Sequence, residues 1–296
     1  MSSLLGELSS GPSGLRALLG SPDPVVAPGA YDALSARLIE AAGFPAVYMT
    51  GFGTSASYLG RPDVGLMTMA EMVDQARRIV QAVGVPVIAD ADTGYGNPLN
   101  VIRTVHAYEN AGVAAIHIED QVSPKKCGHM EGKQVIPAED MVQKVRAAVA
   151  AKSSPDFVLI ARTDARAVEG FEPALERCRR YRDAGADVIF FEAPQSADEI
   201  ARVAEELRGT ALMFNWAEGG KTPPVPLSRL SELGYTVVIF PITALLSATK
   251  AVREALEAIR RDGVPDLSRM VPFPEFLDFV GLPEVRELEQ RFSSGE

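Results

Sequence analysis

A segment at positions 123–133, SPKKCGHMEGK, gathers residue types that can move a proton or bind an anion. Positive charge close to a thiol lowers its pKa and makes it a thiolate or a ready proton donor. No second cysteine is close in sequence, which argues against a redox pair and against a zinc site with spaced cysteines. We therefore interpret the segment as an acid/base site rather than a plain surface loop. In it, Cys127 stands beside Lys125 and Lys126 and just before Gly128 and His129.

Acidic residues follow several short apolar segments, at the positions where buried strands would end. Asp90 and Asp92 lie two apart in VIADADTGYGN, and Glu119 and Glu192 end two further segments. Carboxylate oxygens suit Mg²⁺, which keeps several waters and binds substrate oxygens, and Mn²⁺ would accept the same ligands. A turn rich in Asp and Gly for backbone reasons is the alternative. The acids at neighbouring strand ends favour the metal site.

Two features could hold the carboxylates of a small acid. The segment TGFGTSA, at 50–56, matches the G-x-G-x-x-A dinucleotide pattern, but Arg61-Pro62 would cut off the helix that this pattern requires. We expect its glycines to form a loop whose backbone N–H groups approach an anion. The planar guanidinium of Arg162 matches a carboxylate, and a structural ion pair with an interior acid is about as well supported.

A regular alternation of strands and helices must position these residues. Short apolar segments predict strands, and apolar residues at helical spacing lie between them. Eight such repeats without a composition break predict a single (β/α)₈ barrel domain over residues 1–296, with a doubly wound open sheet as the alternative. Residues 241–296 add a C-terminal helical segment, a cap or a subunit contact. The predicted strands are 25–28, 46–50, 86–90, 114–120, 157–162, 187–192, 211–215 and 236–240.

The barrel prediction brings the strand ends together, because barrel active sites lie at the carboxyl ends of the strands. Alternate residues of a strand share a face, so His117 and Glu119 should point inward. Ile116 and Ile118 should then pack against the helices. His117 could be an interior residue hydrogen-bonded to a neighbour, and Cys178, in a helical pattern, is expected to be structural.

The bulk composition limits the possible partners and location. The formal net charge of −10 argues against a nucleic-acid or anionic-membrane surface, so an anionic substrate would need local positive charge. Two cysteines are too few for a disulfide scaffold. The N-terminus lacks the pattern of a signal peptide, and no segment reaches the roughly 18 apolar residues of a membrane helix. We expect a cytoplasmic protein that does not bind membranes.

Several motifs occurring together resemble the isocitrate lyase/phosphoenolpyruvate mutase superfamily. DADTGYGN and IEDQ precede KKCGH, and ARTDAR and EGGKTP follow it, so that the likeness covers nearly the whole chain. The cysteine-bearing loop marks the lyase branch. The chain resembles 2-methylisocitrate lyases, 2,3-dimethylmalate and other 2-alkylmalate lyases, and enzymes named carboxyphosphonoenolpyruvate phosphonomutase.

This resemblance implies a barrel whose last helix is exchanged between partners, in a homotetramer built as a dimer of dimers. It also implies Mg²⁺ chelated by a 2-oxo acid, hence a small anionic carboxylate as substrate. By position, Asp90 and Asp92 would hold the metal and its waters, and Asp63 and Glu119 would support them.

The resemblance also implies roles around the substrate. Cys127 would be the general acid on a mobile loop, with Lys125, Gly128 and His129 around it. The 2-oxo acid end would be held by Tyr48, Thr50, Gly51 and Phe52, and the other carboxylate by Arg162, Glu192 and Asn215.

The implied reaction is the retro-aldol cleavage of a 2-hydroxy di- or tricarboxylate into a 2-oxo acid and a carboxylate. Tyr48, or a water held by Asp63, would take the hydroxyl proton, and Cys127 would protonate the carbanion. Phe52 and the residues 130–132 differ from methylisocitrate lyases, which weakens that substrate. P–C bond formation on a phosphonate precursor is the alternative, and a non-catalytic binder of 2-oxo acids is a third hypothesis.

Overall fold

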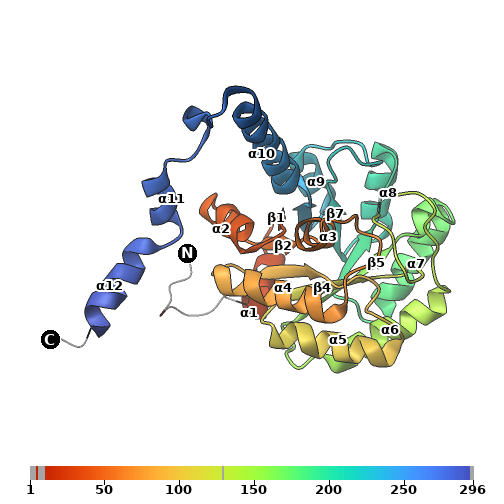
Figure 1. Ribbon diagram of the computed structural model, residues 1–296. Coiled ribbons are helices and arrows are strands. Elements are labelled where there is room, and N and C mark those ends of the chain that lie inside the picture. Colours follow the sequence, from red (N-terminus) through yellow and green to blue (C-terminus); the bar gives the residue numbers. More distant parts are fainter. Residues whose placement is uncertain (1–4, 6–10, 129, 294–296) are drawn as a thin grey trace. The chain divides into compact units, whose positions relative to one another are not determined.

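The structure is a computed structural model that describes residue 5, residues 11–128 and residues 130–293 (Figure 1). Contacts within the chain divide it into two compact units. One, the barrel unit, extends to Leu245, and the other, the C-terminal unit, comprises the described residues from Leu246 onward together with Leu5. His129, one of the predicted catalytic residues, lies outside the described residues.

The barrel unit contains a closed sheet of eight parallel strands, which confirms the predicted (β/α)₈ barrel and excludes the open sheet. Each strand pairs with the next in the sequence, and β8 closes the ring by pairing with β1. The strands are β1 (Val25–Ala30), β2 (Val47–Met49), β3 (Val87–Asp90), β4 (Ala115–Glu119), β5 (Val158–Thr163), β6 (Val188–Phe191), β7 (Ala211–Asn215) and β8 (Val237–Phe240).

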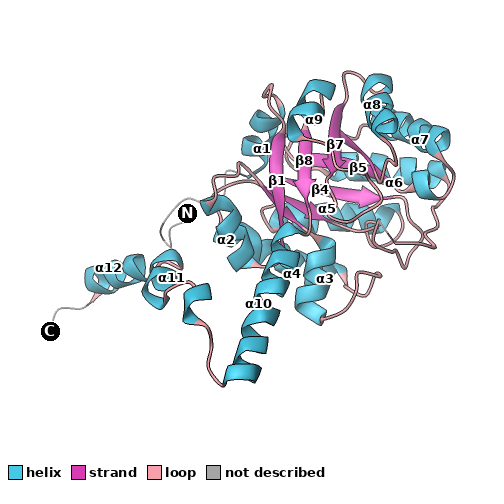
Figure 2. Ribbon diagram, turned by 90° about the horizontal axis from the view of Figure 1, so that it is seen from above, coloured by secondary structure: helices cyan, strands magenta, loops and turns pink. Residues whose placement is uncertain are grey.

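Helices surround these strands (Figure 2). Several begin at a side chain that accepts a hydrogen bond from the first turn, as Asp32, Thr68, Asn97 and Ser196 do. The helices of the barrel unit are α1 (Gly11–Leu19), α2 (Ala33–Ala41), α3 (Gly51–Leu59), α4 (Met69–Ala82), α5 (Pro98–Asn110), α6 (Ala138–Ala151), α7 (Phe171–Asp183), α8 (Ala197–Glu206) and α9 (Leu227–Leu233), with a 3₁₀ turn at Ala165–Ala167.

Two separate apolar layers follow from the alternation of side chains along each strand. The interior of the barrel is filled by side chains such as Ile88, Ile160 and Phe190. Ile116 and Ile118 of β4 belong to the outer layer, between the sheet and the helices, as predicted. The intervening polar residues, His117 and Glu119, are buried as well. The carboxyl half of β4 therefore carries buried polar groups.

The glycines of TGFGTSA begin a helix, so the prediction of a loop there is wrong. Thr50 caps α3 by accepting a hydrogen bond of 3.2 Å from the Gly53 N–H. Helix α3 ends at Gly60, directly before Arg61-Pro62, which limits it to 9 residues. Gly51 allows the backbone to approach the acids, because a Cβ there would lie 2.8 Å from the Asp90 Cγ.

The C-terminal unit consists of helices with little buried surface of their own. They are α10 (Thr243–Asp262), which begins in the barrel unit, a 3₁₀ turn (Leu267–Arg269), α11 (Phe273–Phe279) and α12 (Leu282–Phe292). Among the described residues after Leu245, only Ala258 is buried within the chain. None of the helices in the described part of the chain has the length and apolarity needed to span a membrane.

Candidate active site

A cavity of about 220 Å³ brings together most of the predicted site residues at the carboxyl ends of the strands. Gly51, Asp92 and Glu119 are not part of its lining. Asp92 and Glu119 lie behind it, in contact with the lining residues Lys125 and Arg162. The predicted residues that line the cavity are Tyr48, Thr50, Phe52, Asp63, Asp90, Lys125, Cys127, Gly128, Arg162, Glu192 and Asn215.

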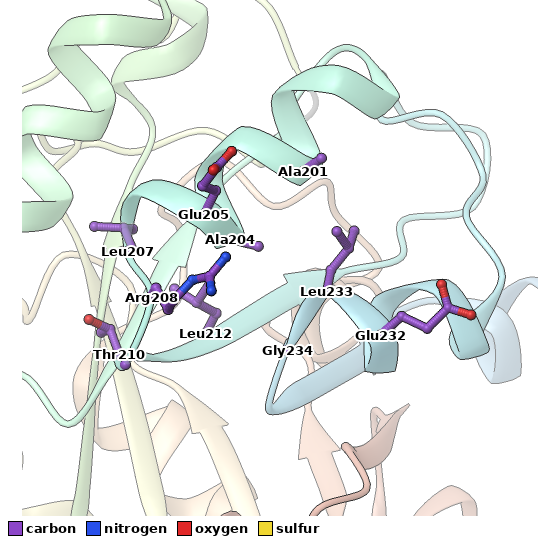
Figure 3. Close-up of a pocket in the computed structure, with 11 residues that line it drawn as sticks. Ala201, Ala204, Glu205, Leu207, Arg208, Thr210, Leu212, Glu232, Leu233 and Gly234 are labelled. Carbon is purple, nitrogen blue, oxygen red and sulfur yellow. The ribbon is translucent and has the colours of Figure 1, made fainter.

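A larger hollow of about 490 Å³ lies elsewhere on the barrel unit, between α8, β7 and α9 (Figure 3). Its lining includes Glu205, Arg208 and Leu233, and Leu212 places it near the amino end of β7. Barrel enzymes carry out their chemistry at the opposite ends of the strands. The smaller cavity is therefore the candidate active site.

The ammonium group of Lys125 lies among the predicted metal-binding acids. Its Nζ is 2.6 Å from Asp63 Oδ2 and 2.7 Å from Asp92 Oδ1, and all three side chains are buried. Asp90 adjoins this cluster, because its Oδ1 accepts a hydrogen bond of 2.9 Å from the Asp92 N–H. Lys125 was expected to act on the Cys127 thiol, whereas the structure pairs it with carboxylates.

These acids are buried, and the nearby cations offset the cost of their negative charge only in part. Burial raises the pKa of Asp92 to about 7, against the effect of Lys125 and with a further contribution from Asp90. Burial likewise raises the pKa of Glu119 well above its ordinary value, although the guanidinium of Arg162 opposes this shift. The Oε1 atom of Glu119 is buried and has no hydrogen-bond partner in the part of the chain that the structure describes. An additional cation here would favour the ionised carboxylates.

The carboxylate oxygens at this site suit Mg²⁺ better than a metal ion that takes all of its ligands from the protein. Within the described ranges, no three acidic, histidine or cysteine side chains are grouped as a metal cage would require. Mg²⁺ is usually held by one or two carboxylates together with waters and substrate oxygens. Asp90, Asp92 and Glu119 offer oxygens of this kind, and Asp90 also lines the cavity.

His117 is an interior barrel residue bonded to a neighbour, as predicted. Its Nε2 shares a hydrogen bond of 2.8 Å with the Tyr48 hydroxyl. Burial lowers the pKa of His117 to about 4, so the imidazole is neutral at physiological pH. Burial, with Asp90, raises the pKa of Tyr48 well above its ordinary value. The phenol therefore keeps its proton and is a hydrogen-bonding group rather than a strong base.

Arg162 takes part in an interior ion pair, which was one of the two predicted interpretations. Its Nε and Nη2 donate hydrogen bonds of 2.9 and 3.0 Å to the two carboxylate oxygens of Asp164. The Nε also lies 3.2 Å from Glu119 and 3.9 Å from Glu192. Asn215 donates to both oxygens of Glu192, at 3.2 and 3.3 Å. Arg162 still borders the cavity, so the ion pair also fixes the guanidinium there.

The loop that bears Cys127 lies directly against this cluster. The Cys127 N–H donates a hydrogen bond of 3.2 Å to the Asp63 carbonyl, and the side chain is half-buried at the cavity. A Cβ on Gly128 would lie 2.5 Å from Arg162 Nη2 and 2.5 Å from Glu192 Oε1. Lys126 donates at 2.9 Å to the Gly132 carbonyl, within the loop. Both lysines therefore have oxygen partners of their own in the structure.

Sequence reasoning missed the residues that support the site from beneath. Asp120 accepts hydrogen bonds from the Thr163 hydroxyl at 2.7 Å, the Asp164 N–H at 2.9 Å and the Tyr181 hydroxyl at 2.8 Å. Lys133 is 2.7 Å from Asp164 Oδ1. A signal was present, because Asp120 and Asp164 each directly follow a strand end, as the predicted Glu192 does.

The two thiols should differ in reactivity in the folded protein. Cys127 is half-buried at the cavity, whereas Cys178 is fully buried in α7. Burial, with Asp120, raises the pKa of Cys178, which leaves little thiolate to react. We expect dithionitrobenzoate to titrate one thiol in the native protein and the second only after unfolding in guanidinium. A Cys127→Ser variant should show no native reaction, and a fast second thiol would contradict the described packing.

Relatives with similar sequences are enzymes of one family. The family model described as "Phosphoenolpyruvate phosphomutase" matches residues 15–260. A 2,3-dimethylmalate lyase from Eubacterium barkeri is 51% identical, over 95% of this chain and 98% of the relative. A 2-methylisocitrate lyase from Aeropyrum pernix is 44% identical over 94% and 90% of the two chains. A chloroplastic carboxyvinyl-carboxyphosphonate phosphorylmutase from Arabidopsis thaliana is also 44% identical, over 91% and 81%.

Solved structures with the same fold have related activities. A 2,3-dimethylmalate lyase, described as a member of the PEP mutase/isocitrate lyase superfamily, has a TM-score of 0.91 at 42% identity, over 96% of this chain and 98% of that one. An oxaloacetate acetylhydrolase with 3,3-difluorooxalacetate has a TM-score of 0.91 at 40% identity, with the same coverage. A phosphonopyruvate hydrolase with oxalate and Mg²⁺ has a TM-score of 0.86 at 33% identity, over 95% and 98%.

These matches agree with the geometry of the cavity, where buried acids, a guanidinium and a loop cysteine meet at the carboxyl ends of barrel strands. They also extend over nearly the full length of both partners. The chain belongs to the phosphoenolpyruvate mutase/isocitrate lyase superfamily.

Proposed function

We propose that this protein is a Mg²⁺-dependent carbon–carbon lyase that cleaves a 2-hydroxy di- or tricarboxylate, of the 2-alkylmalate or methylisocitrate type, into a 2-oxo acid and a carboxylate. The observation that carries the proposal is the cysteine loop, which brings Cys127 to a cavity also bordered by Asp90 and Arg162. A thiol, an acid that suits a metal and a fixed guanidinium are the groups that such a cleavage needs. The relatives named as lyases support the same reaction class.

Asp90 and Asp92, supported by Asp63 and Glu119, would hold the Mg²⁺. When bound, the metal acts as a Lewis acid that stabilises negative charge on the 2-oxo acid oxygens. The buried Oε1 of Glu119, which has no hydrogen-bond partner among the described residues, and the raised pKa of Asp92 support the binding of a cation here. The structure of a relative that contains oxalate and Mg²⁺ supports the same cofactor, and Mn²⁺ would suit the same oxygens.

The protein's own residues would orient the substrate. The amino end of α3, with Thr50, Gly51 and Phe52, would receive the 2-oxo acid end, because the first N–H groups of a helix attract anions. Arg162 would offset the charge of the other carboxylate, and Glu192 and Asn215 would shape its pocket. The raised pKa of Tyr48 favours a water held by Asp63 as the base that takes the 2-hydroxyl proton.

Cleavage leaves the electron pair of the broken carbon–carbon bond on the departing carboxylate fragment, as a carbanion. Cys127 would donate its thiol proton to that carbon, with Gly128 and His129 following it in the sequence and Lys125 anchoring the loop before it. The thiol is half-buried at the cavity, which limits competing protonation by water. In balance, the O–H and carbon–carbon bonds break, a C=O bond and a C–H bond form, and the proton taken by the base returns to the Cys127 thiolate.

We also propose that the protein is a homotetramer in which the C-terminal unit exchanges between partners. That unit exposes large apolar side chains that a monomer would leave in water. Leu267 is 74% exposed, Phe273 is 71% exposed and Leu256 is 60% exposed. Apolar surface of this extent marks an interaction site. A cytoplasmic location is proposed with it, in keeping with Cys127 and Cys178, which form no disulfide within the described residues.

An assay with a panel of substrates tests the reaction class. We expect turnover with 2,3-dimethylmalate, another 2-alkylmalate or 2-methylisocitrate, and loss of that turnover when Mg²⁺ is removed with EDTA. Turnover only with carboxyphosphonoenolpyruvate, or only hydrolysis of oxaloacetate, would assign one of the other activities named among the relatives. Oxalate binding without turnover of any compound would indicate a non-catalytic binder.

Substitution of the thiol tests the role of Cys127. We expect Cys127→Ser to lower kcat by about 10²- to 10⁴-fold, the usual range for loss of a general acid, because a hydroxyl is a much weaker acid. Mg²⁺ binding measured by calorimetry should be unchanged. Cys178→Ala is the matched control, since that thiol is buried away from the cavity. Turnover that survives in Cys127→Ser would reject the assignment.

Light scattering after size exclusion tests the proposed assembly. The intact protein should have the mass of a tetramer, and the double variant Leu267→Glu/Phe273→Glu should have a smaller one, because charges cannot be buried in an apolar interface. Leu99→Glu is the control, as Leu99 is 73% exposed on the barrel unit. A monomeric intact protein would refute the assembly.

A further inference from the structure

We propose that Lys133, a residue with no assigned role, positions the catalytic cysteine by anchoring the far end of its loop to the barrel. The proposal rests on the function proposed above, in which Cys127 is the proton donor. Lys133 does not line the cavity, so it is a positioning residue rather than a catalytic one.

Lys133 joins the loop to a residue at the end of strand β5. Its side chain is 2% exposed, and its Nζ donates a hydrogen bond of 2.7 Å to Asp164 Oδ1. The same ammonium also donates to the carbonyl oxygen of Gly128, the residue next to Cys127. A buried cation with a carboxylate and a carbonyl as partners is held strongly in one place. The backbone beside the thiol is thereby attached to the barrel.

The other end of this anchor is itself fixed. The carboxylate of Asp164 accepts hydrogen bonds from both Nε and Nη2 of Arg162. The backbone N–H of Asp164 donates a further hydrogen bond to Asp120 Oδ1. Asp120 in turn accepts from Thr163 and Tyr181. Every member of this network is buried, so Asp164 has little freedom to follow the loop if the loop moves. Lys133 therefore holds Gly128 against a rigid part of the protein.

The Gly128 backbone lies so close to its neighbours that no side chain would fit between them. Its missing Cβ would lie 2.5 Å from both Arg162 Nη2 and Glu192 Oε1. Because Lys133 binds the Gly128 carbonyl, the loop backbone stays in close contact with Arg162 and Glu192, which border the substrate cavity. On the near side of the thiol, Lys125 binds Asp63 and Asp92. Lys133 supplies the equivalent attachment on the far side of Cys127.

The two loop lysines provide a matched pair of variants. Lys126 also donates to backbone carbonyls, those of Gly132 and Glu131, but both partners belong to the loop itself. Lys126→Met removes a loop contact and leaves the loop attached to the barrel, whereas Lys133→Met removes the attachment. Lys133→Gln keeps a polar group of similar volume in the buried site and serves as the second variant if Lys133→Met folds poorly.

Two measurements that do not depend on turnover test the anchor. In Lys133→Met and Lys133→Gln, we expect amide hydrogen exchange to rise at least tenfold in peptides covering 123–133 and to stay unchanged in β3 and β4. Alkylation of Cys127 by iodoacetamide should accelerate by a similar factor, with Cys178 as an unreactive internal standard. Lys126→Met should match the unmodified protein in both. Equal exchange and equal alkylation in all four proteins, or exchange raised throughout the barrel, would overturn the proposal.

Kinetics complete the test and separate this inference from the proposed reaction. Misplacement of a reacting group by about 1 Å can cost 10²-fold, so we expect kcat to fall by about 10- to 100-fold in Lys133→Met and by less than about twofold in Lys126→Met. Mg²⁺ affinity should not change. If the unmodified protein turns over none of the panel while the loop still loosens, the reaction is wrong and the anchor stands. A loosened loop with undiminished kcat would show that Lys133 does not position the donor.

Discussion

Buried acids and the few cations that accompany them dominate the candidate site. Asp63, Asp92, Glu119 and Asp164 are all buried, and the cations in contact with this group include Lys125 and Arg162. Removing charges from water is expensive unless they are paired, so the positions of these side chains are mutually dependent. The barrel supplies the rigid frame, and burial raises the pKa values of Glu119 and Asp92 within it. In the proposed metal site, metal affinity and local stability would arise from the same charges.

The fold could be predicted because its signals are local and repeated. Each strand is a short apolar segment in the sequence, and each predicted range overlaps an observed strand. Closure of the sheet followed from the number of repeats. The loop predicted at 50–56 was wrong because Arg61-Pro62 only limits the length of α3, while Thr50 supplies a cap that allows a short helix to form.

The site could be predicted as a set of residue types but not as a set of contacts. Strand ends placed Asp90, Glu119 and Arg162 at one end of the barrel. Whether Lys125 faces the thiol or the acids depends on the course of an irregular loop, and sequence spacing does not determine that course. Lys133 was missed for the same reason, since its partner Asp164 is 31 residues away in the chain.

Gly128 affects how far water reaches the charged groups beside the active-site loop. Because a hydrogen atom replaces a side chain there, the backbone can cover Arg162 and Glu192 and displace solvent from them. Charges interact more strongly once water is excluded. A negatively charged ligand bound beside this guanidinium would therefore be attracted more strongly than in a hydrated pocket, and the carboxylate of Glu192 would repel it more strongly. The absence of a side chain at Gly128 thus strengthens both interactions at the cavity.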